Sequence, residues 1–107
     1  MIRNLTQNLI ISQHELHAVS LPQQIRGLMF RKKHNLIMTF PKEQPISLHN
    51  FFVFYPLDIL ILNQKKEIIE IKHKFKPFTF YKAKHQGKYI IELAYPSTCE
   101  VNDQLKF

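Results

Sequence analysis

The chain has 107 residues, 45% of them hydrophobic, and a formal net charge of +7. This length suits one domain with its own core, and the apolar content excludes an intrinsically disordered chain. The single cysteine excludes an intramolecular disulfide and a cluster of thiolate metal ligands. We therefore expect one folded domain over residues 1–107, whose basic balance favours acidic partners without identifying one.

The first twelve residues, MIRNLTQNLIIS, lack the long apolar run and the small-residue cleavage site of a secretory signal. The longest nearly apolar stretch, residues 51–62, is shorter than the roughly 20 residues that a membrane-spanning helix needs. These two features predict a cytoplasmic protein with no membrane insertion.

Two short extended segments, residues 9–11 and 14–19, are predicted before a short helix in SLPQQIRGL. Ser20 is suited to cap this helix, and Gln23 occupies the third helical position, as in a capping box. Gly27 can end the helix in the left-handed conformation. The histidines of HELH (14–17) would share a face on a helix and could bind a metal, but on the predicted strand they point to opposite faces.

The middle of the chain is rich in β-forming residues. NLIMTF (35–40) predicts a strand, and Pro41 and Pro45 then bracket a loop. Residues 51–54 and 57–62 are two apolar runs that are too short and too rich in β-formers to favour helix.

The second half contains further strand signals. NQKK (63–66) is a polar turn, and residues 67–75 alternate well enough to pair with 57–62 as a hairpin. YIIEL (89–93) predicts another strand, and Asn102 suits a turn with a positive φ. The predicted fold is a mainly β domain, either an antiparallel β-sandwich or a small barrel, with one short helix.

Four stretches carry a resemblance to a known family: RGLMFR (26–31), HNFFVFYPLDILILN (49–63), KYIIEL (88–93) and VNDQLKF (101–107). In this order they resemble the domain of unknown function 192 family, also called uncharacterised protein family 0127, over roughly residues 12–107. The resemblance implies a compact, sandwich-like β domain, in a family without a settled biochemical activity.

The chain departs from the family pattern at three places. Val53 and Phe54 stand where many members have Met-Arg, which removes a positive charge that a shared anion-binding role would use. The usual Leu-Pro-Ala-Gly segment is replaced at residues 93–96. Asn102 replaces a glycine of the final turn, and asparagine tolerates the left-handed conformation that such a turn requires.

His49 and Asp58 flank Pro56, where a bend would bring them to one rim. With Arg26 or Arg31 they would form an acid–base or anion-binding cluster, because histidine titrates near neutrality and arginine binds carboxylates and phosphates. Alternatively, Asp58 pairs with one of those arginines or accepts backbone N–H groups, because a buried unpaired carboxylate is very costly. We expect this structural role for Asp58.

The segment KHKFKPFTFYKAKHQGK (72–88) is basic and contains no acidic residue. Lysines beside aromatic rings are typical of single-stranded nucleic-acid binding, but lysines also protect an edge strand from aggregation. We expect at least two of Phe78, Phe80 and Tyr81 to be buried, so nucleic acid is not the favoured partner. The lysines of this possible polyanion surface are Lys72, Lys74, Lys76, Lys82, Lys84 and Lys88.

The sequence thus favours a non-enzymatic domain that binds a small ligand or a protein partner near Arg26, Arg31, His49 and Asp58. An enzyme that uses His49 as acid or base together with Asp58 is the first alternative. Weak binding of single-stranded nucleic acid or another polyanion through residues 72–88 is the second. No metal site and no cofactor are expected, and Glu92 is predicted to point outward or to pair with a lysine.

Overall fold

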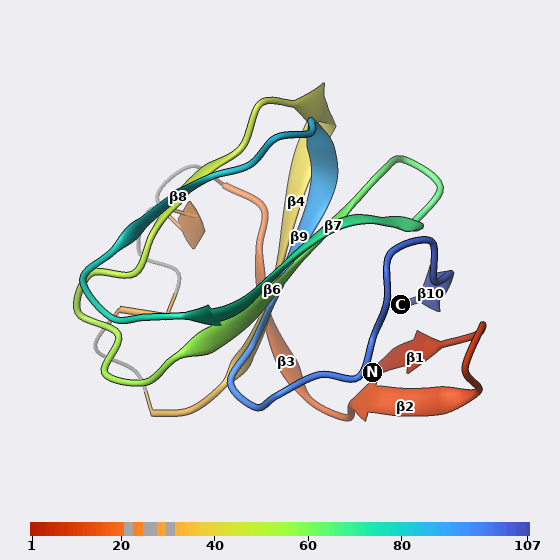
Figure 1. Ribbon diagram of the computed structural model, residues 1–107, viewed down its shortest axis with the longest axis horizontal. Coiled ribbons are helices and arrows are strands. Elements are labelled where there is room, and N and C mark those ends of the chain that lie inside the picture. Colours follow the sequence, from red (N-terminus) through yellow and green to blue (C-terminus); the bar gives the residue numbers. More distant parts are fainter. Residues whose placement is uncertain (21–22, 25–27, 30–31) are drawn as a thin grey trace.

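The computed structural model describes residues 1–20, 23–24, 28–29 and 32–107 (Figure 1). In this part of the chain the strands form a five-stranded sheet with the order β3-β4-β9-β6-β7, a three-stranded sheet β10-β1-β2 and a two-stranded ribbon β5-β8. The strands are β1 (Ile2–Asn4), β2 (Leu9–Ser12), β3 (Glu15–Ala18), β4 (Asn35–Gln44), β5 (Ser47–His49), β6 (Leu57–Leu62), β7 (Ile68–Phe75), β8 (Phe80–Lys82), β9 (Gly87–Leu93) and β10 (Leu105–Lys106). The predicted mainly β fold is confirmed.

The five-stranded sheet is the middle layer of the molecule. Neighbouring side chains of a strand point to opposite faces, and in β6 both faces are buried: Ile59 belongs to one hydrophobic cluster and Leu60 to the other. The first cluster includes Leu48 from β5, and the second includes Ile2 from β1. Cover on both faces explains why β6 reads as a nearly continuous apolar run instead of an alternating one.

The predicted hairpin of β6 and β7 is confirmed. The two strands pair antiparallel with Leu60 opposite Ile71, and the register shifts at both ends of β6. Near the shift between Leu57 and Ile59, at the start of β6, Lys74 adopts a left-handed φ of 52°. Such bulges add residues to one strand and turn its side chains, which matters for the partner of Asp58.

β4 is longer than the sequence predicted. The expected strand 35–40 continues through Pro41 to Gln44, where a loop was expected. The ladder between β4 and β9 is irregular from Thr39 to Gln44. Proline lacks an N–H group, and it is tolerated in a strand at such an irregularity because no regular ladder bond depends on it.

The predicted start of the short helix is confirmed. Gln23 N–H donates to Ser20 Oγ over 3.4 Å, and Ser20 N–H donates to Gln23 Oε1 over 3.2 Å, which is the reciprocal bonding of a capping box. Gln23 and Gln24 are helical, whereas Gly27, the predicted end, lies outside the described residues. Within the described ranges, no helix has both the length and the apolar character that crossing a membrane requires.

Gly87, the first residue of β9, occupies a site without room for a side chain. A Cβ atom there would lie 2.5 Å from Ile61 Cγ2. Ile61 is fully buried and β-branched, so its methyl group cannot rotate away freely. We expect Gly87→Ala to lower the free energy of unfolding by about 1–3 kcal/mol in urea titrations. Gln86→Ala, at the exposed neighbouring position, is the control, and equal stability of both variants would contradict the expected overlap.

Candidate functional site

Asp58 is buried in β6 and holds three neighbouring groups with its carboxylate. Lys74 N–H donates to Oδ1 over 3.1 Å, Ser97 N–H donates to Oδ2 over 2.8 Å, and His73 Nδ1 lies 2.9 Å from Oδ2. Asp58 therefore fastens β6 to β7 and to the connector after β9. Of the two structural arrangements that the sequence predicted, these contacts form the one with backbone N–H donors. Arg26 and Arg31, the other predicted partners, lie outside the described residues.

The imidazole beside Asp58 belongs to His73, which the sequence analysis did not select. If β6 and β7 paired in a continuous register on either side of the turn 63–66, Asp58 would lie opposite Ile71. In the observed register Leu60 faces Ile71, and the irregularity between Leu57 and Ile59 brings His73 next to Asp58. His73 could not be selected from the sequence, because no local sequence pattern specifies the pairing register that brings it to Asp58.

His49 lies at the end of β5 and is exposed. Phe51 N–H donates to its Nδ1 over 3.4 Å, and the two rings lie 5.1 Å apart. Among the described contacts none joins His49 to Asp58. The proposed acid–base pair of these two residues is therefore not brought together by hydrogen bonding here.

A pocket of about 420 Å³ lies beside Asp58 at the predicted proline bend. Most of its surface is apolar, and lysines contribute its positive charge. Lys33 Nζ lies 5.1 Å from the centre of the Tyr95 ring, within the range of a cation–π contact. We call this cavity the Asp58 pocket; it is lined by Lys33, Pro56, Asp58, Lys74, Lys76, Pro77, Ala94, Tyr95 and Pro96.

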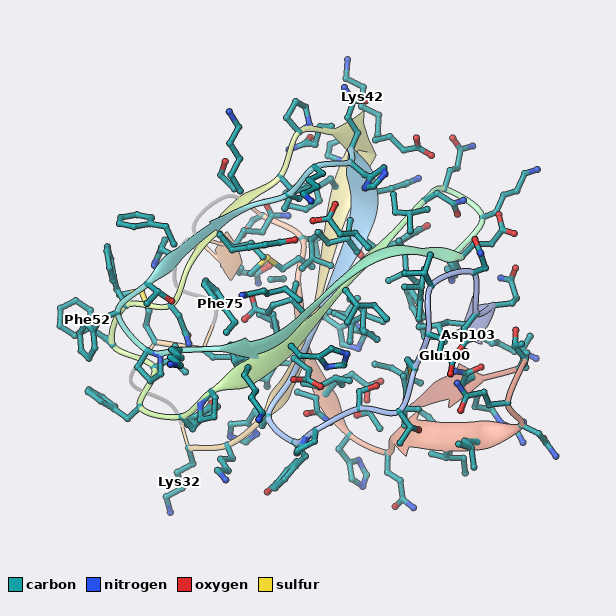
Figure 2. All side chains as sticks on the ribbon, in the orientation of Figure 1. Lys32, Lys42, Phe52, Phe75, Glu100 and Asp103 are labelled. Atoms are coloured by element: carbon teal, nitrogen blue, oxygen red, sulfur yellow. The ribbon has the colours of Figure 1, made fainter. Side chains whose placement is uncertain are left out.

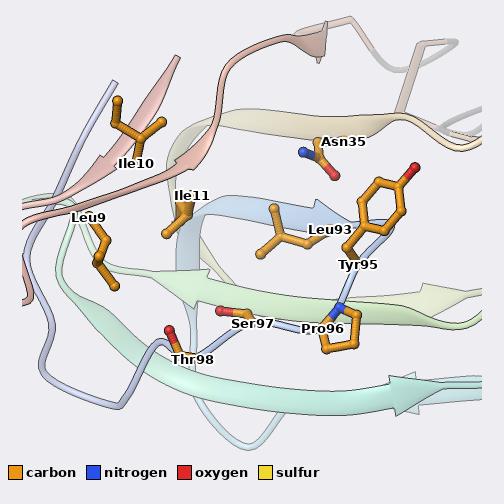
Figure 3. Close-up of a pocket in the computed structure, with 9 residues that line it drawn as sticks. All are labelled: Leu9, Ile10, Ile11, Asn35, Leu93, Tyr95, Pro96, Ser97 and Thr98. Carbon is orange, nitrogen blue, oxygen red and sulfur yellow. The ribbon is translucent and has the colours of Figure 1, made fainter.

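A smaller pocket of about 220 Å³ adjoins it on the other side of the connector after β9 (Figure 3). Figure 3 shows Leu9 and Ile11 of β2 on one side of this pocket and Ser97 and Thr98 of the connector on the other. Tyr95 and Pro96 line both pockets. The connector thus forms a wall that the two pockets share.

The aromatic residues of the lysine segment are more exposed than the sequence predicted. Phe78 is 54% exposed and Phe80 is 75% exposed, so the expected burial of at least two of the three rings is wrong. Of the three rings only Tyr81 is partly buried, and it contacts Phe75 in the core.

The run 51–54 forms a turn with Phe52 at a φ of 58° instead of a strand. Of the six lysines, Lys74, Lys76, Lys82 and Lys84 are exposed, and Lys72 and Lys88 are half-buried.

A second buried carboxylate, Glu70 in β7, fixes the segment that follows β8. It accepts hydrogen bonds from Tyr81 Oη, from Lys84 N–H over 2.9 Å and from His85 Nδ1 over 2.8 Å. Burial opposes ionisation, but the hydrogen bonds from Tyr81 and His85 outweigh it and lower the pKa of Glu70. Burial and the Glu70 hydrogen bond raise the pKa of Tyr81 to about 12. The cluster therefore holds a carboxylate and a neutral phenol at neutral pH.

Glu92 corrects another sequence prediction, because its side chain points inward. It is only 6% exposed, and its neighbours across the sheet are Leu36 and Ile59. Burial raises the pKa of Glu92 to about 7.

The predicted strand at HELH is observed for residues 15–17. In the described ranges no three His, Cys, Asp or Glu side chains form a group able to hold a metal ion.

The sequence is similar to proteins of one family. The profile described as "Uncharacterized ACR", DUF192, matches residues 7–103. A UPF0127 protein of Pyrococcus furiosus is 36% identical over 88 residues, which cover 76% of this chain and 75% of the relative. A UPF0127 protein of Thermococcus sibiricus is 34% identical over 74 residues, or 65% of this chain. That match covers 47% of the Thermococcus protein, about half its length.

Two crystal structures have a similar fold. A protein of unknown function from Novosphingobium aromaticivorans has a TM-score of 0.78 with 18% identity, over 85% of this chain and 72% of that one. A protein from Sinorhizobium meliloti, named as a candidate transcription regulator, has a TM-score of 0.83 with 21% identity, over 98% of this chain and 90% of that one. At these identities the likeness concerns the fold alone.

Proposed function

The chain belongs to the DUF192 family of uncharacterised proteins, and from this premise we propose that it is a non-enzymatic domain that binds a small anionic ligand in the Asp58 pocket. The family description gives no activity, so the proposal rests on the pocket itself. Its volume of about 420 Å³ lies within the range of roughly 300–1,000 Å³ that is usual for small-molecule sites.

The lining of the Asp58 pocket favours a ligand with an apolar body and a negative charge. The prolines and Tyr95 offer an apolar surface, and Lys33, Lys74 and Lys76 supply ammonium groups. A carboxylate or phosphate would accept charge-assisted hydrogen bonds from these lysines. A side chain of a protein partner that carries a carboxylate would offer the same chemistry.

Asp58 supports this function by positioning the pocket wall. Its oxygens already accept the N–H groups of Lys74 and Ser97, so it holds both β7 and the connector in place. Lys74 keeps a left-handed φ of 52° at this point. Strained backbone of this kind persists only where the surroundings fix it, and it is concentrated at functional sites.

Titration with phenyl phosphate, followed by ¹H–¹⁵N NMR, tests the proposal. We expect saturable shifts of the amides of Lys33, Lys74 and Tyr95, and at least about tenfold weaker binding of phenol, because phenol lacks the charge that the lysines attract. Tyr95→Ala and Lys74→Ala should each weaken binding of phenyl phosphate. Lys106→Ala, an exposed lysine on β10, should leave it unchanged.

Two results would contradict this function. One is equal affinity for phenol and phenyl phosphate, which would remove the role of the lysines. The other is a set of shifted amides that excludes the lining of the Asp58 pocket.

A further inference from the structure

The ribbon of β5 and β8 turns one face to the core and one to solvent. In its register Leu48 faces Tyr81, and His49 faces Phe80. Leu48 is buried and Tyr81 packs against the core, so the alternating neighbours His49, Phe80 and Lys82 lie on the outer face. An imidazole, a phenyl ring and an ammonium group therefore share one exposed surface.

Rings from the two adjoining turns extend this surface. Phe51 lies 5.1 Å from His49 and 4.9 Å from Phe80 between ring centres, and Phe78 lies 6.4 Å from Phe51. Figure 2 shows Phe52, from the same turn, at the outer edge of the molecule, and Phe75 inside it. We call the set of His49, Phe51, Phe78, Phe80 and Lys82 the ribbon face.

The ribbon face has a local excess of positive charge. No acidic residue occurs in residues 44–57 or 71–91, the two stretches that form it. Of the acids that border them in the sequence, Asp58, Glu70 and Glu92 are buried. Glu43 accepts a hydrogen bond from Gln64 N–H over 2.9 Å. A polyanion is therefore the complementary partner.

The two turns of the ribbon face are held together by Asn50. Its Nδ2 donates to the Phe75 carbonyl over 2.9 Å, and its backbone bonds to Thr79 and Phe78 over 2.9 and 2.7 Å. Phe52 and Phe78 both have a left-handed φ, of 58° and 60°. Because the turns are fixed in this strained form, the rings are positioned before any partner arrives.

We propose that the ribbon face binds single-stranded nucleic acid. Bases would stack on Phe80 and its neighbouring rings, and phosphates would contact Lys82. The nucleic acid must be single-stranded because in a duplex the faces of the bases are covered by the neighbouring base pairs. The observation that carries this proposal is an exposed phenyl ring beside a lysine on one strand face, and the ribbon face shares no residue with the Asp58 pocket.

Fluorescence anisotropy with a labelled oligothymidine at low and at physiological salt tests this inference. Phe80→Ala should weaken binding about tenfold or more, as expected for the loss of one stacked base. Phe80→Tyr keeps a stacking ring and should retain the affinity. Lys82→Ala should weaken binding and reduce the dependence of log affinity on log salt by about one.

Matched controls separate stacking from charge. Val101→Ala and Lys106→Ala remove an exposed apolar side chain and an exposed lysine elsewhere, and both should bind like the wild type. Circular dichroism should show that every variant is folded. Equal affinity for a duplex of the same length, or unchanged binding by Phe80→Ala, would overturn the proposal. Binding to vesicles of anionic phospholipid without binding to the oligonucleotide would also overturn it and assign the face to a membrane surface.

Discussion

Asp58→Asn is expected to lower the free energy of unfolding by about 2–4 kcal/mol. The wild-type carboxylate accepts two backbone N–H groups and faces His73. Asparagine keeps only one acceptor oxygen, and its NH₂ group would face a donor. A partly buried N–H group would therefore lose its partner, and leaving a donor unpaired is the expensive way to remove a hydrogen bond. Backbone N–H donors were one of the two kinds of partner that the sequence predicted for Asp58.

Urea unfolding at pH 7 measures this loss for Asp58→Asn. His73→Ala should lower stability by less than about 1 kcal/mol, because a polar contact with an exposed side chain contributes little. The His73 side chain is 55% exposed. Glu100→Gln, at an exposed carboxylate, is the matched control. If Asp58→Asn unfolds at the wild-type midpoint, the carboxylate does not hold the strands together.

Glu92→Gln is expected to make the protein more stable than the wild type, and increasingly so as the pH rises. The folded-state pKa of Glu92 is raised from 4.5 to about 7 by burial. The unfolded chain therefore releases this proton at a lower pH than the folded chain does, so wild-type stability falls as the pH rises from about 4.5 through about 7. Between pH 5 and 8 this loss amounts to about 2–3 kcal/mol, most of it complete by pH 7. Glutamine cannot ionise, so Glu92→Gln does not lose this stability as the pH rises.

The measured quantity for Glu92 is the difference in unfolding free energy between Glu92→Gln and the wild type at pH 5, 6, 7 and 8. Taking the difference cancels the titration of every other group. Glu100→Gln should give a difference that does not change with pH. Parallel curves for Glu92→Gln and the wild type would mean that water or another group stabilises the charged form of Glu92.

Features specified by neighbouring residues could be predicted from the sequence. The capping box of Ser20 and Gln23 and the positive φ of Asn102, 80°, depend on a few adjacent residues. The hairpin of β6 and β7 follows from two patterned runs around a polar turn. The pairing of β5 with β8 could not be predicted in this way, because each strand has three residues and their partners are far apart in the sequence.

The candidate sites were harder to predict than the fold. Asp58 was identified because a carboxylate in an apolar run needs partners, but its histidine depends on a bulged register. Glu92 was predicted to point outward or to pair with a lysine, but position along a strand is an unreliable guide to side-chain direction when both faces of a sheet are covered. At least two of Phe78, Phe80 and Tyr81 were expected to be buried by the general rule that soluble proteins rarely expose large apolar patches. Local rules often fail at functional surfaces.

The pairing of β1 with β10 has a consequence for the order of folding. Asn4 of β1 lies opposite Leu105 of β10, so this ladder joins segments about a hundred residues apart. The loop-closure entropy of such a contact is large, and it must be overcome before the pairing stabilises anything. The β6–β7 hairpin closes a turn of only a few residues and can form early. We therefore expect the hairpin to nucleate the central sheet, the three-stranded sheet to assemble late, and the chain to fold on the slower timescale of β proteins.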